Sequence, residues 1–230
     1  MTSMKRLLTI IAAAIIALSS TVKAQDEAYK FDVGGALGLG GYLGEANQSN
    51  IYAHPSYSAQ VFFRYLINTR WALKTNVLTT HISGNTADME NVYPEFQPYE
   101  FSSQVYDLSA RIEYNFFPYG IGEKYKKLHR LTPYLSLGIG ANISVVDGHD
   151  YFAGSIPMGV GLKFKLKPRI NLGCEFTMAK CIGDHIDGKD LKDLYLIKSS
   201  FAKNTDWIST FGVSISFEFG ERCTSCFYVD

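Results

Sequence analysis

The sequence predicts an all-β protein: an eight-stranded antiparallel transmembrane β-barrel in an outer membrane. Three observations lead to this prediction. An export signal opens the chain, and eight later segments alternate apolar and polar residues with a period of two. No segment after residue 24 approaches the ~18 consecutive apolar residues of a membrane-spanning helix. Chains with this pattern cross outer membranes as closed barrels, with apolar side chains toward lipid and polar side chains toward the lumen.

The first 24 residues indicate a signal peptide. Lys5 and Arg6 supply the positive start, residues 7–18 are apolar except for Thr9, and a Val-Lys-Ala cleavage site ends at Ala24. We therefore expect a mature chain of 206 residues beginning at Gln25, with one barrel domain over 25–219 and a tail over 220–230. Both termini are expected in the periplasm.

Composition narrows the class of protein further. Lys plus Arg and Asp plus Glu number 22 each, so the formal net charge is zero and nucleic acid is not an expected partner. Aromatic residues make up 14% of the chain, with 15 Tyr and 15 Phe. Such a content suits the aromatic belts that membrane barrels carry at both lipid–water interfaces.

The alternating segments predict eight strands, at residues 29–43, 55–67, 70–82, 104–117, 132–146, 155–167, 169–181 and 206–219. The segment 55–67 shows the pattern most clearly. Its apolar face carries Tyr57, Ala59, Val61, Phe63, Tyr65 and Ile67, and its polar face carries Ser56, Ser58, Gln60 and Arg64. Alternation of this kind is typical of a strand with two different environments on its two faces.

Charged residues indicate which face points to lipid. A Lys or Arg near the lipid midplane costs about 2–4 kcal/mol, so strand charges are expected inside. The clear strand charges all lie opposite the apolar face: Asp32, Arg64, Lys74, Asp107, Arg111, Glu113, Lys163, Lys165, Glu175 and Glu218. A soluble sandwich or lipocalin-like barrel would reverse the faces. Aromatic residues at both ends of the apolar faces, among them Trp71 and Tyr106, favour the membrane barrel.

The lumen of such a barrel is expected to be closed, because eight strands leave room only for side chains. The five positive and five negative inward residues, all except Asp107, lie toward the periplasmic strand ends and predict a salt-bridged plug there. Small residues in the other half suggest a shallow cleft open to the outside: Gly38, Gly40, Ser56, Ser58, Gly138, Gly140, Gly159, Thr210 and Gly212.

The connections alternate in length. Residues 68–69 and 167–169 form tight turns, whereas 44–54, 83–103 and 182–205 are long and 147–154 is shorter. Short turns face the periplasm in known barrels. The connection 117–131 departs from this rule because it is long and basic, with Lys124, Lys126, Lys127, His129 and Arg130. It is either a solvated loop or a docking surface for a periplasmic partner.

No catalytic, metal or cofactor site is expected, and the protein is not expected to be an enzyme. The glycine-rich run 34–41 lacks the Gly-Lys-Ser/Thr of a phosphate loop and no helix follows it. The five histidines show no metal-ligand spacing. His81, with Ser83 nearby, has outward parity, which argues against a catalytic role in the lumen.

The four cysteines fall into two groups. Cys174 and Cys181 have opposite parity and lie about 23 Å apart along one strand, too far to form a disulfide. Cys174 is expected to face lipid as a small apolar residue. Cys223 and Cys226 lie in the tail, where three states are open: a local disulfide, two free thiols, or a covalent link to a periplasmic partner. A Cys-x-x-Cys redox site is disfavoured because no βαβ context surrounds it.

Several runs of sequence carry a family resemblance that covers nearly all of the mature chain. They are residues 40–44, 63–65, 68–74, 113–119, 132–135, 156–163 and 206–207. In their order and spacing these runs resemble the PorG family, an outer-membrane barrel component of the type IX secretion system of Bacteroidetes-type bacteria. The 147–154 connection looks shorter than in that family, and the acidic run after the seventh strand is reduced to Asp184, Asp187 and Asp190.

The resemblance implies a role in protein secretion and not a reaction. Proteins of that family are thought to tie a periplasmic ring, built from a lipoprotein and a soluble partner, to the outer membrane. We expect the basic connection and the cysteine tail to contact the ring, mainly its lipoprotein, with a disulfide from Cys223 or Cys226 as one means. The alternative is a passive structural or adhesive barrel that acts through its 83–103 and 182–205 loops. Membrane lipid is the other expected partner, and no small-molecule substrate is expected.

Overall fold

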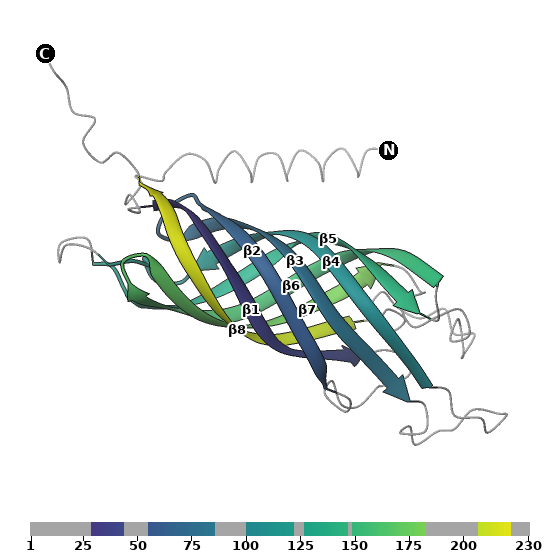
Figure 1. Cartoon of the computed structure of the whole chain (residues 1–230). Helices are drawn as coiled ribbons and strands as arrows, with labels where there is room; N and C mark the ends of the chain where they lie inside the picture. The colour runs from purple at the N-terminus through teal and green to yellow at the C-terminus, as the bar shows by residue number, and fades with distance from the viewer. Residues whose placement is uncertain are drawn as a thin grey trace, which may run out of the picture.

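The computed structural model describes residues 29–43, 55–85, 100–121, 127–146, 149–182 and 207–221. These residues form eight strands: β1 (Tyr29–Leu43), β2 (Ser56–Leu66), β3 (Trp71–Asn85), β4 (Glu100–Asn115), β5 (Leu131–Val146), β6 (His149–Lys167), β7 (Ile170–Ile182) and β8 (Trp207–Glu221). Every strand is antiparallel to its neighbours, and β8 pairs with β1 to close the sheet into a barrel (Figure 1). The predicted fold class is therefore confirmed.

The strand boundaries differ from the predicted ones mainly at one end of the barrel. β4 begins at Glu100 and β6 at His149, several residues before the predicted starts, and the β5–β6 ladder continues up to Val146 opposite His149. Most of the predicted 147–154 connection is therefore strand. The sequence there lacks apolar alternation, but backbone pairing does not require it where strands extend past an apolar band. At the other end, β8 continues to Glu221, two residues past the predicted strand end.

Alternation along the strands sorts the side chains into an apolar outer wall and a polar interior. All ten predicted inward charges are buried, whereas large apolar side chains such as Leu37, Ile139 and Phe152 are more than 70% exposed on the outer wall. A soluble barrel has the opposite arrangement, with its apolar residues inside. The predicted assignment of faces is therefore confirmed. The described residues include no helix with the length and apolarity needed to cross a membrane.

Aromatic side chains gather at both ends of the outer wall. We call the end of the barrel that carries the turns 68–69 and 167–169 the short-turn end. There, the Phe31 ring lies 5.5–5.8 Å from the rings of Phe63, Tyr65 and Phe219. On the same rim, Trp71 and Tyr114 pack with ring centroids 4.7 Å apart. Tyr57 and Tyr106 are exposed toward the other end. Two such belts are expected where a barrel wall meets the two lipid–water interfaces.

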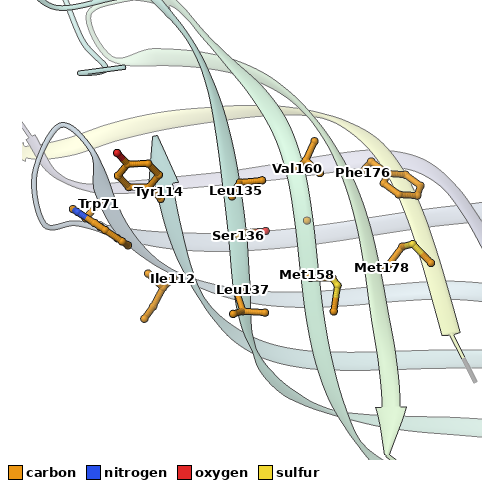
Figure 2. A pocket seen from close by; sticks show the side chains of 11 residues that line it. Trp71, Ile112, Tyr114, Leu135, Ser136, Leu137, Met158, Val160, Phe176 and Met178 are labelled. Carbon is orange, nitrogen blue, oxygen red and sulfur yellow. The ribbon is translucent and has the colours of Figure 1, made fainter. Parts of the chain in front are cut away.

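Side chains on the outer wall leave a shallow hollow over β4–β7 and the first residue of β3, shown in Figure 2. It measures about 590 Å³ and extends from Trp71 and Tyr114 across Ile112 to Phe176 and Met178. The side chains that rise around it are apolar or aromatic, so it offers the surface that lipid tails pack against. We assign it to the ordinary lipid contact of the wall.

Candidate functional site

Strand register gathers the inward charges into one layer of the lumen. Asp32 on β1 pairs with Arg64 on β2, Arg64 with Lys74 on β3, and Lys74 with Arg111 on β4. Three cations thus lie side by side on the inner wall, an arrangement that repels itself unless anions reach it from elsewhere. Those anions are Glu113, two residues after Arg111 on β4, and Glu175 on β7, on the far side of the barrel.

Glu113 on β4 is the centre of this network. Its carboxylate accepts hydrogen bonds from Arg64 Nε at 2.9 Å and from Lys163 Nζ at 2.6 Å, and it lies 3.8 Å from Lys74 Nζ. Arg64 also donates to Asp32 through Nη1 at 2.9 Å. Glu113 is fully buried, so a single carboxylate holds three buried cations. Charges this deep are tolerated only when they are paired.

Glu175 on β7 completes the layer from the opposite wall. Lys74 Nζ donates to its Oε2 at 2.5 Å, Ser136 donates to its Oε1 at 3.1 Å, and Arg111 Nη1 lies 3.7 Å from Oε1. Arg111 also donates to Thr177 at 3.2 Å. The network therefore spans the lumen from β1 to β7.

A second ion pair lies nearer the short-turn end. Lys165 Nζ donates to both carboxylate oxygens of Glu218 at 2.6 Å, and Asn171 Nδ2 donates to the same carboxylate at 2.9 Å. The space left beside these groups, between Asp32 and Glu218, measures about 10 Å³, room for about one water. The predicted salt-bridged plug is confirmed, and this half of the lumen is closed.

Two inward aromatic residues support the network and were not predicted from the sequence. The Phe62 ring lies 4.1 Å from the Arg64 guanidinium carbon and 4.9 Å from Lys74 Nζ, and the Tyr134 ring lies 4.3 Å from Lys163 Nζ. Cations over ring faces are attracted by the ring quadrupole. A sequence signal existed, because both aromatics occupy positions of polar-face parity. A glycine on the neighbouring strand leaves room for the Phe62 ring, because a Cβ on Gly34 would lie only 2.7 Å from it.

The predicted cleft in the other half of the lumen is wrong. A Cβ on Gly38 would collide with the backbone of β8, and one on Gly140 would lie 2.6 Å from Ser155 Oγ. Asn76 and Thr80 are fully buried at this level. The glycines therefore mark close approach between neighbouring strands and side chains and do not line open space.

The two described ends of the connection 117–131 form a cap over the short-turn end of the barrel. The Tyr119 N–H donates to Thr69 O at 3.0 Å, and its buried hydroxyl donates to Asn171 Oδ1 at 2.7 Å. Tyr119 also forms a parallel bridge with His129, whose N–H donates to Pro118 O at 2.8 Å. Because Asn171 also binds Glu218, the cap is tied directly to the ion pairs inside.

The cap leaves a basic and aromatic surface on its outer side, which we call the mouth surface: Phe117, Lys127, His129 and Arg130. All four residues are exposed, and the Phe117 and His129 rings lie 5.2 Å apart. Lys127 has a φ of 47°, a left-handed conformation that non-glycine residues seldom adopt. The other predicted partner-binding residues, Lys124, Lys126, Cys223 and Cys226, lie outside the described residues.

We expect Tyr119→Phe to loosen this cap. The substitution keeps the ring but leaves the buried Asn171 Oδ1 without its donor, at a cost of about 1–3 kcal/mol. Hydrogen exchange of the Tyr119 and Gly120 amides should quicken, whereas the amide of Val77 in mid-strand should be unchanged. Unchanged exchange at all three amides would show that the hydroxyl does not hold the cap.

The remaining chemical candidates also have definite places. His81 is on the outer face, as predicted, with Nε2 3.2 Å from Ser102 Oγ. Cys174 and Cys181 are both free, and the buried Cys181 lies 3.3 Å from Asn142 Nδ2. Lys180 has outward parity and was missed among the strand charges; its Nζ lies 5.7 Å from the Trp207 ring centre. The part of the chain that the structure describes contains no group of three or more metal-ligating side chains.

Comparisons with known proteins agree with the barrel. A family model described as "Domain of unknown function (DUF6089)" matches residues 5–229. No curated protein matches the chain. The solved structure of Neisserial surface protein A (NspA) is 16% identical with a TM-score of 0.50, covering 82% of this chain and 97% of that chain.

Two further outer-membrane structures are similar to a lesser degree. Ail of Yersinia pestis, solved with the heparin analogue sucrose octasulfate, is 11% identical with a TM-score of 0.48, covering 83% of this chain and 99% of that one. OprG of Pseudomonas aeruginosa is 10% identical with a TM-score of 0.46, covering 87% of this chain and all of that one. At these identities the NspA likeness shows the fold alone, that of a small outer-membrane β-barrel.

Proposed function

This chain belongs to the family described as Domain of unknown function (DUF6089), and we propose that it is an outer-membrane anchor of a type IX protein secretion machine. In this role the barrel holds a periplasmic ring against the membrane through its short-turn end. The proposal starts from the resemblance to the PorG family in runs such as residues 113–119 and 156–163. It also places both termini of the mature chain in the periplasm.

The closed lumen supports an anchoring role over a transport role. A pore needs an open path, but the ion pairs around Glu113 and Glu218 and the Tyr119 cap leave a cavity of about 10 Å³ at this end. The work of such a barrel is then done on its surfaces.

The mouth surface is the observation that carries the proposal. Its connection is longer than a periplasmic turn needs to be, yet its ends are fixed to the barrel by Tyr119 and the His129 bridge. A fixed cap presents Phe117 as an exposed aromatic among the cations Lys127 and Arg130. Aromatic anchors within charged rims are common in protein interfaces, and the positive charge suits an acidic partner surface.

Charge reversal tests this surface. We expect Lys127→Glu with Arg130→Glu to reduce co-purification of the ring lipoprotein about tenfold, because like charges then face each other across the contact. The matched control is Lys30→Glu with Lys167→Glu, which changes the net charge equally at exposed positions of β1 and β6. Equal loss in both double variants would mean that charge alone matters, and the proposed contact would be rejected. Crosslinking in intact membranes then identifies the attached protein.

The cysteine tail provides a second arm of the same experiment. If Cys223 or Cys226 joins the barrel covalently to the ring lipoprotein, membranes run without reductant should show a heavier band that reductant removes. Replacing both cysteines with serine should abolish that band. A band that reductant leaves unchanged would rule out the intermolecular disulfide but not the mouth contact.

Loss of the gene separates anchoring from the alternative of a passive structural or adhesive barrel. A component of the secretion machine should be required for export of many proteins at once. Normal secretion in cells that lack the barrel would refute the secretion role and leave the 83–103 and 182–205 loops as the surfaces to study.

A further inference from the structure

A second groove crosses the outer wall, away from the hollow of Figure 2. It measures about 760 Å³ and runs across neighbouring strands from β7 and β8 over β1–β3 to β4. Register explains it: Ile215, Gly35, Val61 and Val77 lie in one row across four strands, and Val213, Leu37, Ala59, Thr79 and Tyr106 lie in the next. Gly35 and Ala59 are the small residues in the two rows, and they form the floor.

The groove is apolar along its length and polar at one edge. Its walls are the exposed side chains of Leu37, Val61, Val77 and Val213. At the edge, Tyr57 donates to Gln104 Oε1 at 2.9 Å, and Gln104 Nε2 donates to Thr79 Oγ1 at 2.7 Å. Thr79 belongs to both the groove and this polar edge, so the two are continuous.

Toward the end of the barrel opposite the Tyr119 cap, the polar edge continues as a cluster of aromatic and hydroxyl side chains. The Tyr57 and His81 rings stack with an interplanar angle of 9° and centroids 6.1 Å apart, and His81 Nε2 lies 3.2 Å from Ser102 Oγ. We call Tyr57, Thr79, His81, Ser102 and Gln104 the rim cluster. It lies at the end of the barrel opposite the Tyr119 cap, next to Tyr106 in the aromatic belt. Polar side chains beside an aromatic belt are placed where lipid head groups begin.

Charge indicates which head group fits. The rim cluster contains no Lys or Arg, and the groove contains no charged residue. Next to the rim cluster, the sequence segments 44–54 and 83–103 at the β1–β2 and β3–β4 connections contain five acidic residues and no Lys or Arg. Phosphate and carboxylate head groups are bound by Arg and Lys, so an anionic lipid lacks partners here. Hydroxyls, amides and aromatic faces are instead suited to an uncharged head group that offers many hydroxyls.

We propose that this groove binds one membrane glycolipid, with an acyl chain over Gly35 and Ala59 and an uncharged sugar head against the rim cluster. The apolar groove and the neutral hydrogen-bonding rim match the two halves of such a lipid. The site is independent of the mouth surface, which lies at the other end.

Groove filling tests the acyl-chain half of the proposal. A Cβ on Gly35 would meet its nearest atom, Gln60 O, at an ordinary 3.5 Å, so Gly35→Leu should fold and fill the groove. Ala110→Leu is the matched control, because Ala110 is exposed on β4 outside the groove. The protein is reconstituted in phosphatidylcholine that contains equal amounts of monoglucosyl diacylglycerol and phosphatidylglycerol. The lipid molecules that stay bound are then counted by native mass spectrometry. We expect the glucolipid to be retained, and its retention to fall about tenfold in Gly35→Leu only.

Head-group selectivity tests the other half. His81→Ala with Gln104→Ala should lower retention of the glucolipid to that of phosphatidylcholine, with circular dichroism confirming that the barrel is folded. Equal retention in Gly35→Leu and Ala110→Leu would overturn the groove as the binding site. Retention of phosphatidylglycerol at least as strong as that of the glucolipid would overturn the sugar head. Conversion of the lipid to a product lacking one acyl chain would overturn simple binding, because the lipid would then be a substrate hydrolysed at Ser102 and His81.

Discussion

Glu113→Ala should lower the free energy of unfolding of the barrel by about 3–5 kcal/mol, the effect expected when one partner of a buried ion pair is removed. Glu113 is fully buried and contacts Arg64, Lys163 and Lys74. Without it, Lys163 loses its carboxylate, Arg64 keeps only Asp32, and Lys74 keeps only Glu175. Urea unfolding of the protein in lipid vesicles, followed by tryptophan fluorescence, measures the change.

Glu221→Ala provides the control for this prediction. Glu221 forms an ion pair with Arg169 at 2.5 Å, but both side chains are exposed at the rim. Exposed pairs of this kind contribute about 0–1 kcal/mol. If Glu113→Ala destabilises the barrel no more than Glu221→Ala does, the lumenal network is not what holds the interior together.

Ile139→Arg should destabilise the barrel by about 2–4 kcal/mol in a bilayer, the cost of a cation on the lipid face near the midplane. Ile139 lies in the middle of β5 and is 73% exposed. In a soluble barrel an exposed residue of this kind tolerates a charge with a change within about 0.5 kcal/mol. The free energy of unfolding in vesicles therefore reports directly on whether this wall faces lipid.

Leu131→Arg is the matched change at the edge of the same strand. Leu131 is the first residue of β5 and is 53% exposed at the short-turn rim. Cations near the lipid–water interface cost only about 0–1 kcal/mol. Equal and small effects at Ile139 and Leu131 would argue against a membrane-facing wall, whereas a gradient between them would support it.

The alternation of residues was sufficient to predict the wall and its polarity. Arg64, Lys74 and Arg111 each follow or precede outward apolar neighbours, so a period of two places them inside without knowledge of their partners. The same argument placed His81 and Cys174 outside. Boundaries were less well predicted, because β6 continues to His149 through residues that show no alternation. Past the apolar band, backbone pairing and not side-chain environment decides where a strand ends.

The Tyr119 cap and the contacts of the lumenal aromatics could not be predicted in the same way. The connection 117–131 has a composition that fits a solvated loop. Contacts between residues far apart in the sequence, such as the hydrogen bond from Tyr119 to Asn171, 52 residues away, make its described ends a cap. Parity places the rings of Phe62 and Tyr134 inside, but it does not identify the cations that lie over them, which depend on how neighbouring strands are paired. The predicted cleft was wrong for a related reason: small residues leave space only if nothing from a neighbouring strand fills it.

The sequence by itself determined the number of strands, their order along the chain, and the face of each that meets lipid. These depend on neighbours along one strand, whose side chains point alternately to opposite faces. Only the tertiary structure decided which charges meet, because Lys74 and Glu175 are 101 residues apart and join across the lumen. Closure of the barrel also decided which small residues form a groove and which are filled, since Gly35 faces outward while Gly38 meets the backbone of β8. Both results depend on register and curvature, which no local pattern in the chain contains.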